Sequence, residues 1–198
     1  SMGPNGDRTT TAYNYSLTGQ MLSAETEAEV MYGENFRVKE ENTFSARNNM
    51  IARKTVTVQH GNGTTSPVEI GYEYDAINRL ARVKRGEQVG NVTYGYDVHG
   101  WPTSIETASF KEFLTYADKQ EVPYYNGRIS TMAWENGNYD KRRRYVFLYD
   151  GQDRLIAARY GEGEDFTDNP GNFDEHIYYD DNGNITALER FGKRQDGM

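Results

Sequence analysis

Aromatic and polar residues alternate in short runs along the chain. In the run 72–74 (Tyr-Glu-Tyr) the alternation places two aromatic rings on one face of a strand. The runs 50–58 and 79–83 alternate similarly and contain β-branched or aliphatic residues. No segment sustains a helical period, and the best short helical candidates, 24–31 and 110–116, are each about two turns long. The pattern predicts β-strands, with helix marginal or absent.

A seven-residue motif recurs with these strands. Tyrosine and aspartate are followed by two variable residues, a turn former, one more residue and an aliphatic residue. The lead aromatics recur every 22 to 30 residues, which is typical of stacked supersecondary units. Serine replaces aspartate in the first two copies, proline replaces the aliphatic residue in the fourth, and the fifth is shortened. The seven copies begin at Tyr15, Phe44, Tyr74, Tyr96, Tyr125, Tyr149 and Tyr179.

The motif predicts a hairpin turn. An aspartate or serine accepts hydrogen bonds from backbone amides two residues on, and a glycine, asparagine or aspartate three positions later tolerates the left-handed conformation. Such a residue ends a type I turn that has a glycine-type bulge. The structural turn residues expected from the four aspartate copies are Asp75, Asn78, Asp97, Gly100, Asp150, Asp153, Asp180 and Gly183.

The predicted fold class is all-β: consecutive antiparallel β-hairpins that form one elongated, curved sheet. We expect a single continuous repeat domain over residues 11–191, with a tag remnant and disordered start at 1–10 and a disordered end at 192–198. Hydrophobic residues make up 36% of the chain and include 16 tyrosines, so a modest aromatic layer with one wet face is expected. Open sheet edges predict homo-oligomers.

Composition excludes several classes of partner and cofactor. The net charge of −8 argues against general nucleic-acid binding. The basic block 141–144 is expected to be a solvated strand edge or loop, and the acidic stretch 162–175 a solvated loop in preference to a calcium site. No cysteine is present, and no apolar run approaches a membrane span. We expect no cofactor and no metal.

The sequence offers little for catalysis. His60, His99 and His176 stand apart from other candidate ligands and are expected to face solvent. The repeated aspartates could suggest a glycoside hydrolase, but all occupy the same turn position, which favours a structural role. We therefore predict that the chain is not an enzyme. The candidate sugar-stacking aromatics are Trp101, Trp134, Tyr124 and Tyr125.

The motif resembles the YD (tyrosine–aspartate) repeats of the RHS (rearrangement hot spot) proteins over nearly the whole chain. The stretches 124–134, 145–155 and 177–191 particularly resemble RHS-repeat proteins of Bacteroides-type gut bacteria. In that family many hairpins join into one long sheet that spirals into a hollow shell. The shell encloses a toxic C-terminal segment in polymorphic toxins, and related repeats occur in teneurin adhesion receptors.

The resemblance implies a secreted or cell-surface bacterial protein. The expected partners are the remainder of its own parent chain, meaning further repeats and a C-terminal cargo, and also cell-surface glycans. Toxin-bearing members carry an aspartate-proline-rich core that cleaves its own chain; no Asp-Pro pair occurs here, so self-cleavage is not assigned. About seven units are too few to close a shell of this type, so an open strip is expected.

The function predicted from the sequence is a non-enzymatic structural segment that forms part of a shell wall. The alternatives are a carbohydrate-binding or adhesion module that uses exposed aromatic rows, and a glycoside hydrolase. Each repeated residue has a turn or packing role, which favours the structural function.

Overall fold

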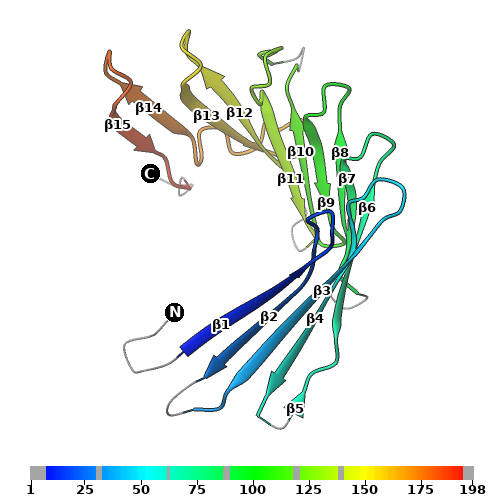
Figure 1. Cartoon of the computed structure of the whole chain (residues 1–198). Coiled ribbons are helices and arrows are strands. Elements are labelled where there is room, and N and C mark those ends of the chain that lie inside the picture. Colours follow the sequence, from blue (N-terminus) through cyan, green and yellow to red (C-terminus); the bar gives the residue numbers. More distant parts are fainter. Residues whose placement is uncertain are drawn as a thin grey trace. The chain divides into compact units, whose positions relative to one another are not determined.

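The chain is all-β. The computed structural model describes residues 8–29, 33–61, 63–86, 90–117, 121–137 and 141–193. Within these ranges there is no helix, and therefore none long and apolar enough to cross a membrane. Fifteen strands form an antiparallel sheet, as the sequence pattern predicts (Figure 1). Of the two short helical candidates, residues 24–29 and 110–115 are strands.

The described residues divide into two compact units, with the boundary between Val92 and Thr93 inside a strand. The repeat motif occurs in both units. The strands of the first unit are β1 (Arg8–Tyr15), β2 (Met21–Glu29), β3 (Phe36–Phe44), β4 (Ile51–His60), β5 (Gly63–Thr64), β6 (Val68–Tyr74) and β7 (Leu80–Lys84). The others are β8 (Val92–Tyr96), β9 (Pro102–Glu106), β10 (Phe110–Thr115), β11 (Thr131–Asn136), β12 (Arg143–Tyr149), β13 (Leu155–Glu162), β14 (Glu175–Tyr179) and β15 (Ile185–Arg190).

Neighbours in the sheet are neighbours in the chain. The strand order follows the sequence from β1 to β15, and only the two-residue β5 lies off this path, paired with β4. Because β1 and β15 each have one partner among the described strands, the sheet is open. Strand β1 begins at Arg8, three residues before the repeat domain expected from the sequence. Residues 1–7 and 194–198 of the expected disordered ends lie outside the described residues.

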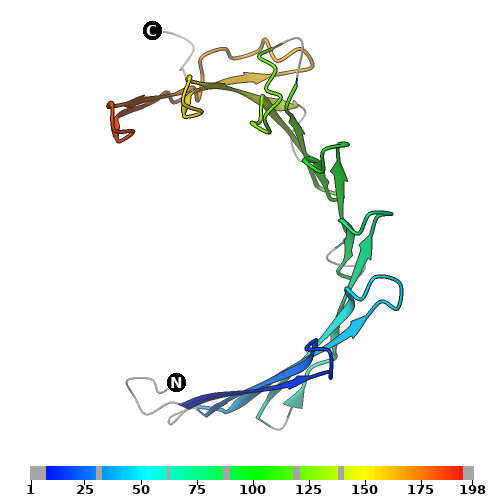
Figure 2. The ribbon, with the colours of Figure 1, turned by 45° about the horizontal axis from the view of Figure 1, so that its top comes forward.

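Each unit is a single layer of strands. In Figure 2 no described helix or second sheet covers either face. The accessible surface is 13791 Å², compared with roughly 9,500 Å² expected for a compact monomer of this mass. Ser130 is the one fully buried side chain among the described residues. Stability must therefore come from bonds and contacts within the layer, since no second layer provides a core.

The first unit has one strongly charged face. Arg37 of β3 forms an ion pair with Glu25 of β2 (Nε to Oε1, 3.2 Å), and Lys39 pairs with Glu41 on the same face (Nζ to Oε1, 2.8 Å). The opposite face carries Val38 of β3 beside Val58 of β4. The Val38 face also carries the ion pair of Lys54 with Glu40 (Nζ to Oε2, 2.7 Å), because side chains alternate between the two faces of a strand. The two faces therefore differ in charge, but neither is covered by a second layer, so the expectation of one wet face is not met.

The turns contain left-handed residues at the motif's turn-former position. The φ angles are 68° at Asn78, 88° at Gly100, 66° at Asp153 and 84° at Gly183. The second copy departs from the pattern, since Asn49 adopts a φ of 60° and Phe44 pairs with Ile51. That turn is one residue longer than the seven-residue motif implies, so its closing aliphatic residue is Ile51 instead of Met50.

A glycine pair tests the left-handed requirement. Gly183→Ala should lower the free energy of unfolding by about 1 kcal/mol, because an added Cβ is strained at positive φ. Gly151→Ala is the matched control, since its φ is not positive and an added Cβ meets no atom within 4 Å. We expect the control to be neutral or slightly stabilising in urea denaturation. Equal losses for both variants would contradict the assignment.

Candidate functional site

The repeated aspartates each close their own turn. One oxygen of Asp75 accepts hydrogen bonds from the backbone N–H groups of Ile77 (3.0 Å) and Arg79 (2.9 Å). Asp150 accepts equivalent bonds from Gln152 (2.9 Å) and Arg154 (3.0 Å). Asp97 and Asp180 accept the same pair of bonds in their turns. The aspartate side chain thus satisfies backbone donors that the reversal of the chain leaves without strand partners.

The second carboxylate oxygen binds a side chain of the same turn. Nε of Arg79 donates to Oδ2 of Asp75 at 2.7 Å, and Nε of Arg154 donates to Oδ2 of Asp150 at 2.7 Å. Nδ2 of Asn184 donates to Asp180 at 2.8 Å. In the Asp97 turn this position is Trp101, and the ring of His99 contacts the carboxylate instead, at 3.2 Å.

These bonds lower the pKa of the turn carboxyl groups. For Asp75 the main cause is the hydrogen bond from the Arg79 side chain, followed by the Arg79 backbone N–H. For Asp150 the backbone N–H of Arg154 is the main cause of the lowered pKa, which burial partly opposes. Hydrogen bonds to the charged form stabilise it, so both groups are carboxylates at neutral pH.

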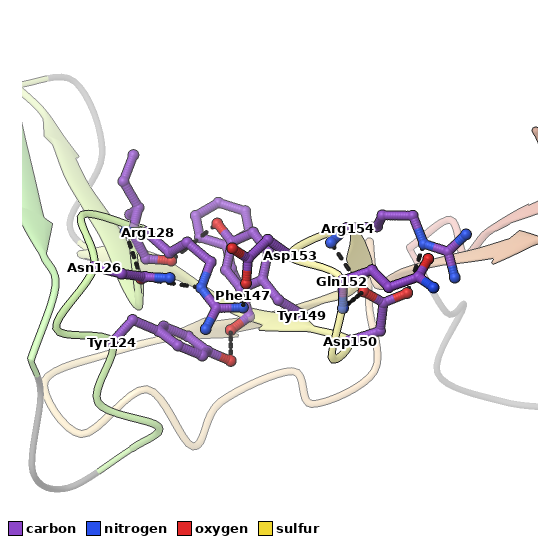
Figure 3. A network of polar contacts seen from close by, with 10 residues as sticks. Tyr124, Asn126, Arg128, Phe147, Tyr149, Asp150, Gln152, Asp153 and Arg154 are labelled. Atoms are coloured by element: carbon purple, nitrogen blue, oxygen red, sulfur yellow. Dashed lines mark hydrogen bonds and ion pairs between the residues drawn. The ribbon is translucent and has the colours of Figure 1, made fainter. Parts of the chain in front are cut away.

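Successive turns are linked to one another. In the second unit Nη1 of Arg128 lies 2.7 Å from Oδ1 of Asp153, and Nη1 of Arg154 donates to the carbonyl of Asp180 at 3.2 Å. Figure 3 shows Arg128 facing Asp153, with Arg154 turned toward Asp150. In the first unit the corresponding link runs from Gln20 Nε2 to Asn49 Oδ1 at 2.8 Å. The motif therefore builds a row of connected turns in each unit.

A tyrosine hydroxyl provides a second link between hairpins. In each case it donates to the carbonyl of the residue directly after the preceding turn, which we call the post-turn residue. Tyr74 donates to Ile51 (2.9 Å), Tyr116 to Pro102 (2.9 Å), Tyr149 to Ile129 (3.1 Å) and Tyr179 to Leu155 (2.9 Å). These hydroxyl bonds recur in both units, and we call them rungs.

The rungs correct the assignment of the fifth copy. Its lead aromatic is Tyr116, not Tyr125 as the sequence motif suggests, because Tyr116 makes the rung to Pro102. The backbone N–H of Tyr124 returns to the carbonyl of Tyr116 at 2.7 Å. Residues 117–123 are therefore an insertion between the lead aromatic and its turn. Tyr125 itself is 74% exposed.

The second copy has a substitute for the rung. Its lead aromatic is Phe44, which has no hydroxyl group. Nδ2 of Asn42, two residues earlier in β3, instead donates to the carbonyl of Met21 at 3.0 Å. Met21 is the post-turn residue of the first turn. A bond to this carbonyl is thus kept although the residue type has changed.

Five joints between successive hairpins have their strand pairs described, and all five share one register. Each joint can be described by one strand pair. One member lies two positions after the post-turn residue of the first hairpin. Its partner lies three positions before the lead aromatic of the next hairpin. The connecting segments nevertheless range from residues 107–109 to residues 163–174. The pairs are Ser23↔Glu41, Arg53↔Gly71, Ser104↔Phe113, Thr131↔Val146 and Ala157↔His176. The joint geometry is therefore independent of loop length.

A groove in the second unit is lined by four aromatic residues that pack against one another. Trp134 of β11 stacks on Tyr145 of β12 with ring centroids 5.6 Å apart, and Tyr160 of β13 packs edge-on against Tyr145. Phe173, from the loop 163–174, packs edge-on against Tyr160 at 5.2 Å. The groove has a volume of about 410 Å³ and is a candidate site for a ligand, beside a larger depression of about 870 Å³ lined by residues that include Lys111, Glu135 and Arg142.

The polar groups of this groove are already engaged with one another. The Tyr160 hydroxyl donates to Oε1 of Glu162 at 2.6 Å, and Nδ2 of Asn169 donates to its Oε2 at 3.0 Å. Burial, followed by the bond to Glu162, raises the pKa of Tyr160. The bond from Tyr160 is also the main cause of the lowered pKa of Glu162. Both oxygens of the Glu162 carboxylate are therefore already hydrogen-bonded within the protein, one of them to Asn169 of the loop 163–174.

The basic block 141–144 is paired residue by residue. Lys141 lies 2.7 Å from Asp168, Arg142 3.5 Å from Glu135, Arg143 3.8 Å from Glu162 and Arg144 2.8 Å from Glu121. Arg142 also lies over the ring of Phe113, and Arg144 over that of Phe166. The block holds neighbouring strands and loops together instead of forming an open basic surface.

The four candidate sugar-stacking aromatics do not form one site. Trp101 stacks on His99 (4.7 Å) and contacts Tyr116 (4.9 Å), whereas Trp134 lies in the aromatic groove. Tyr124 is buried, with its ring edge-on to Tyr149 at 5.0 Å. Tyr125 is exposed. Of the four, Trp134 lines the aromatic groove.

His60 and His99 are exposed, His176 is half-buried against Phe191, and each of the three has an acidic neighbour. His60 lies 2.7 Å from Glu34, His99 3.2 Å from Asp97 and His176 3.8 Å from Glu189. The sequence did not reveal these partners, since two of them come from other strands or connections. The described ranges contain no group of three or more histidine, aspartate or glutamate residues that could hold a metal ion.

Comparisons with known proteins identify no relative. No protein-family model matches the chain, and no curated protein matches it significantly.

Removal of one rung should destabilise the sheet measurably. Tyr149→Phe deletes the hydroxyl that donates to the Ile129 carbonyl but keeps the ring, and should lower the free energy of unfolding by about 1 kcal/mol. Tyr125→Phe removes an exposed hydroxyl and should change it by less than about 0.5 kcal/mol. Urea denaturation followed by circular dichroism measures both. A loss no larger at Tyr149 than at Tyr125 would show that the rung does not stabilise the sheet.

The turn carboxylates should make the fold acid-sensitive. Their pKa is lowered on folding, so their contribution is complete above the unfolded value of about 3.9 and is lost as pH falls through the folded value. The double variant Asp75→Asn/Asp150→Asn keeps an oxygen for the backbone bonds but removes the charges. We expect a lower melting temperature than the parent at pH 7 and a difference that shrinks below about pH 4.

The control for this experiment is Asp181→Asn, which removes an exposed charge beside Asp180 without touching the turn bonds of Asp75 or Asp150. Its melting temperature should follow that of the parent across the same pH range. A double variant that is as acid-sensitive as the parent would contradict the role given to these carboxylates.

Proposed function

We propose that this chain is a non-enzymatic structural segment that forms part of the wall of a larger β-sheet assembly. The observation that carries the proposal is the single register shared by the five described joints. A register kept across connections of very different length is what a wall of interchangeable hairpins requires.

The hydrogen bonds of the repeated aspartates support the same function. Each turn aspartate has both oxygens engaged in its own turn, as at Asp75 and Asp150. A glycoside hydrolase needs two carboxyl groups that face one another across a substrate. The aspartates of successive turns are held by separate turns, so the structural role has more support than hydrolysis.

Carbohydrate binding has less support than the wall function. Aromatic platforms for sugars present an open ring face, whereas Trp134 and Tyr145 cover each other and Tyr124 is buried. In the aromatic groove Glu162 accepts bonds from Tyr160 and Asn169, and it lies close to Arg143. These contacts hold the loop 163–174 against the strands.

The resemblance of the motif to YD repeats gives the proposal its biological setting. The parent would be a secreted or cell-surface RHS-type protein, in which this segment encloses a cargo or contributes to a surface contact. Its partners would be further repeats of the same protein. The setting rests on the motif copies quoted above, with Tyr116 as the lead aromatic of the fifth.

Deletion of one complete unit tests the wall function. Removal of residues 150–179 joins Tyr149 to Asp180, so that β12 continues into the turn 180–184 and pairs with β15. Because the joined positions are equivalent in the motif, the shortened chain should remain folded and all-β, with a cooperative urea transition. Removal of residues 150–178 is the control, since one extra residue moves every β12 side chain to the opposite face.

The in-phase deletion should therefore keep its last strand paired, whereas the out-of-phase deletion should have a lower urea midpoint because its last strand is misaligned. Failure of both would argue against interchangeable units. Saturable binding of the intact chain on a glycan array, abolished by Trp134→Ala, would instead establish the carbohydrate-binding alternative.

A further inference from the structure

The two outer strands β1 and β15 have complementary hydrogen-bonding edges. In β15 the backbone N–H of Phe191 donates to the carbonyl of Asp174, on the β14 side. Because N–H groups alternate in direction along an antiparallel strand, those of Leu188 and Arg190 face away from β14. Leu188 is 47% exposed and Ile185 62% exposed. This edge therefore presents unpaired backbone groups that a further strand can use.

The outer edge of β1 corresponds to the edge that later hairpins use in their joints. In the joint between β11 and β12 the N–H of Phe147, two residues before Tyr149, donates to the carbonyl of Ser130 at 2.9 Å. The residue two before the lead aromatic Tyr15 is Tyr13. By the same alternation the N–H groups of Tyr13 and Thr11 face away from β2.

From this equivalence we infer that β15 of one copy pairs antiparallel with β1 of a second copy, in the register of the internal joints. The inference rests on the proposed wall function and adds a specific partner to it. The register places Ala187 opposite Ala12, and Leu188 opposite Thr11. The Tyr15 hydroxyl then donates to the carbonyl of Ile185, which is the post-turn residue of the last turn.

The side chains of the two edges are compatible in this register. Glu189 stands opposite Thr10 and Arg190 opposite Thr9, so no like charges face each other. Phe191 stands opposite Arg8, an arrangement that favours a cation–π contact. The rings of Tyr13 and Tyr15 are 58% and 55% exposed, and are therefore accessible to a second copy.

The pairing is head-to-tail, since the two edges differ. A heterologous contact of this kind leaves β1 of one copy and β15 of the other unused, so association continues beyond the dimer. If one edge strand paired with the same strand of a second copy, association would instead stop at a dimer. This difference allows the two modes to be separated by blocking one edge at a time.

Two proline variants block the edges separately. Thr11→Pro and Leu188→Pro each remove an N–H that faces outward, which is the position where an edge strand tolerates proline. Sedimentation velocity should show that the parent associates with increasing concentration and that each variant alone is monomeric. A 1:1 mixture of the two variants should form a dimer and nothing larger, because Thr11→Pro keeps β15 and Leu188→Pro keeps β1.

The mixture is also the folding control, since a dimer forms only if both intact edges are native. Circular dichroism of each variant should match that of the parent. A parent that is monomeric at all concentrations, a single variant that dimerises as well as the parent, or a monomeric mixture of folded variants would overturn the inference. None of these outcomes alters the result of the unit deletion, so failure of the pairing and failure of the wall function are distinguishable.

A milder pair of variants tests the register. Tyr15→Phe removes the hydroxyl predicted to reach Ile185 and should weaken association roughly 5-fold, as expected for the loss of one hydrogen bond. Tyr13→Phe removes a neighbouring hydroxyl that has no partner in this register and should leave the association constant unchanged. Equal effects of the two substitutions would show that the strands pair in a different register.

Discussion

The hydrogen bond from a lead tyrosine to the preceding post-turn carbonyl fixes how each hairpin meets the one before it. A sheet of one layer has no second layer to decide which strand face is buried, so its register is only weakly specified by hydrophobic burial. The rungs from Tyr74, Tyr116, Tyr149 and Tyr179 supply a specific contact at this point. The shared register of the joints follows the position of the rung and not the length of the loop.

The turn arginines explain how the rungs are kept in place. Nε of Arg154 donates to Asp150 within its own turn, and the same guanidinium lies 4.6 Å from the ring centroid of Tyr179, the next lead aromatic. Arg128 combines a bond to Asn126 with a position 5.2 Å from the ring centroid of Tyr149. Because one side chain contacts both turns, each turn also positions the tyrosine of the next hairpin. Local turn chemistry thereby becomes a repeating connection along the second unit.

The sequence predicted the local features of this fold and missed the nonlocal ones. The all-β class and the turn geometry at Asn78 and Gly183 depend on a few neighbouring residues, so the motif was sufficient. Tyr116 was missed because residues 117–123 separate it from its turn, and the shortened motif offered Tyr125 as the nearest aromatic. The acidic partners of the basic block 141–144 come from other strands and loops, and sequence spacing carries no signal for such pairs. From its sequence the loop 163–174 was expected only to be a solvated acidic loop. In the structure it packs against Tyr145 and Tyr160, and this path includes positive φ angles at Phe166, Asn169 and Phe173. Favourable tertiary contacts must offset the energetic cost of these backbone conformations.

The high tyrosine content has a structural explanation. An aromatic ring covers a large area of a one-layer sheet, and its hydroxyl reaches a backbone carbonyl that the neighbouring strand does not satisfy. Phenylalanine supplies the ring alone, and in the copy that begins with Phe44 the missing bond is made by Asn42. A side chain of a different type at a different position thus satisfies the equivalent carbonyl. The bond thus gives the hydroxyl a structural role at the lead position of the units where the structure describes a rung.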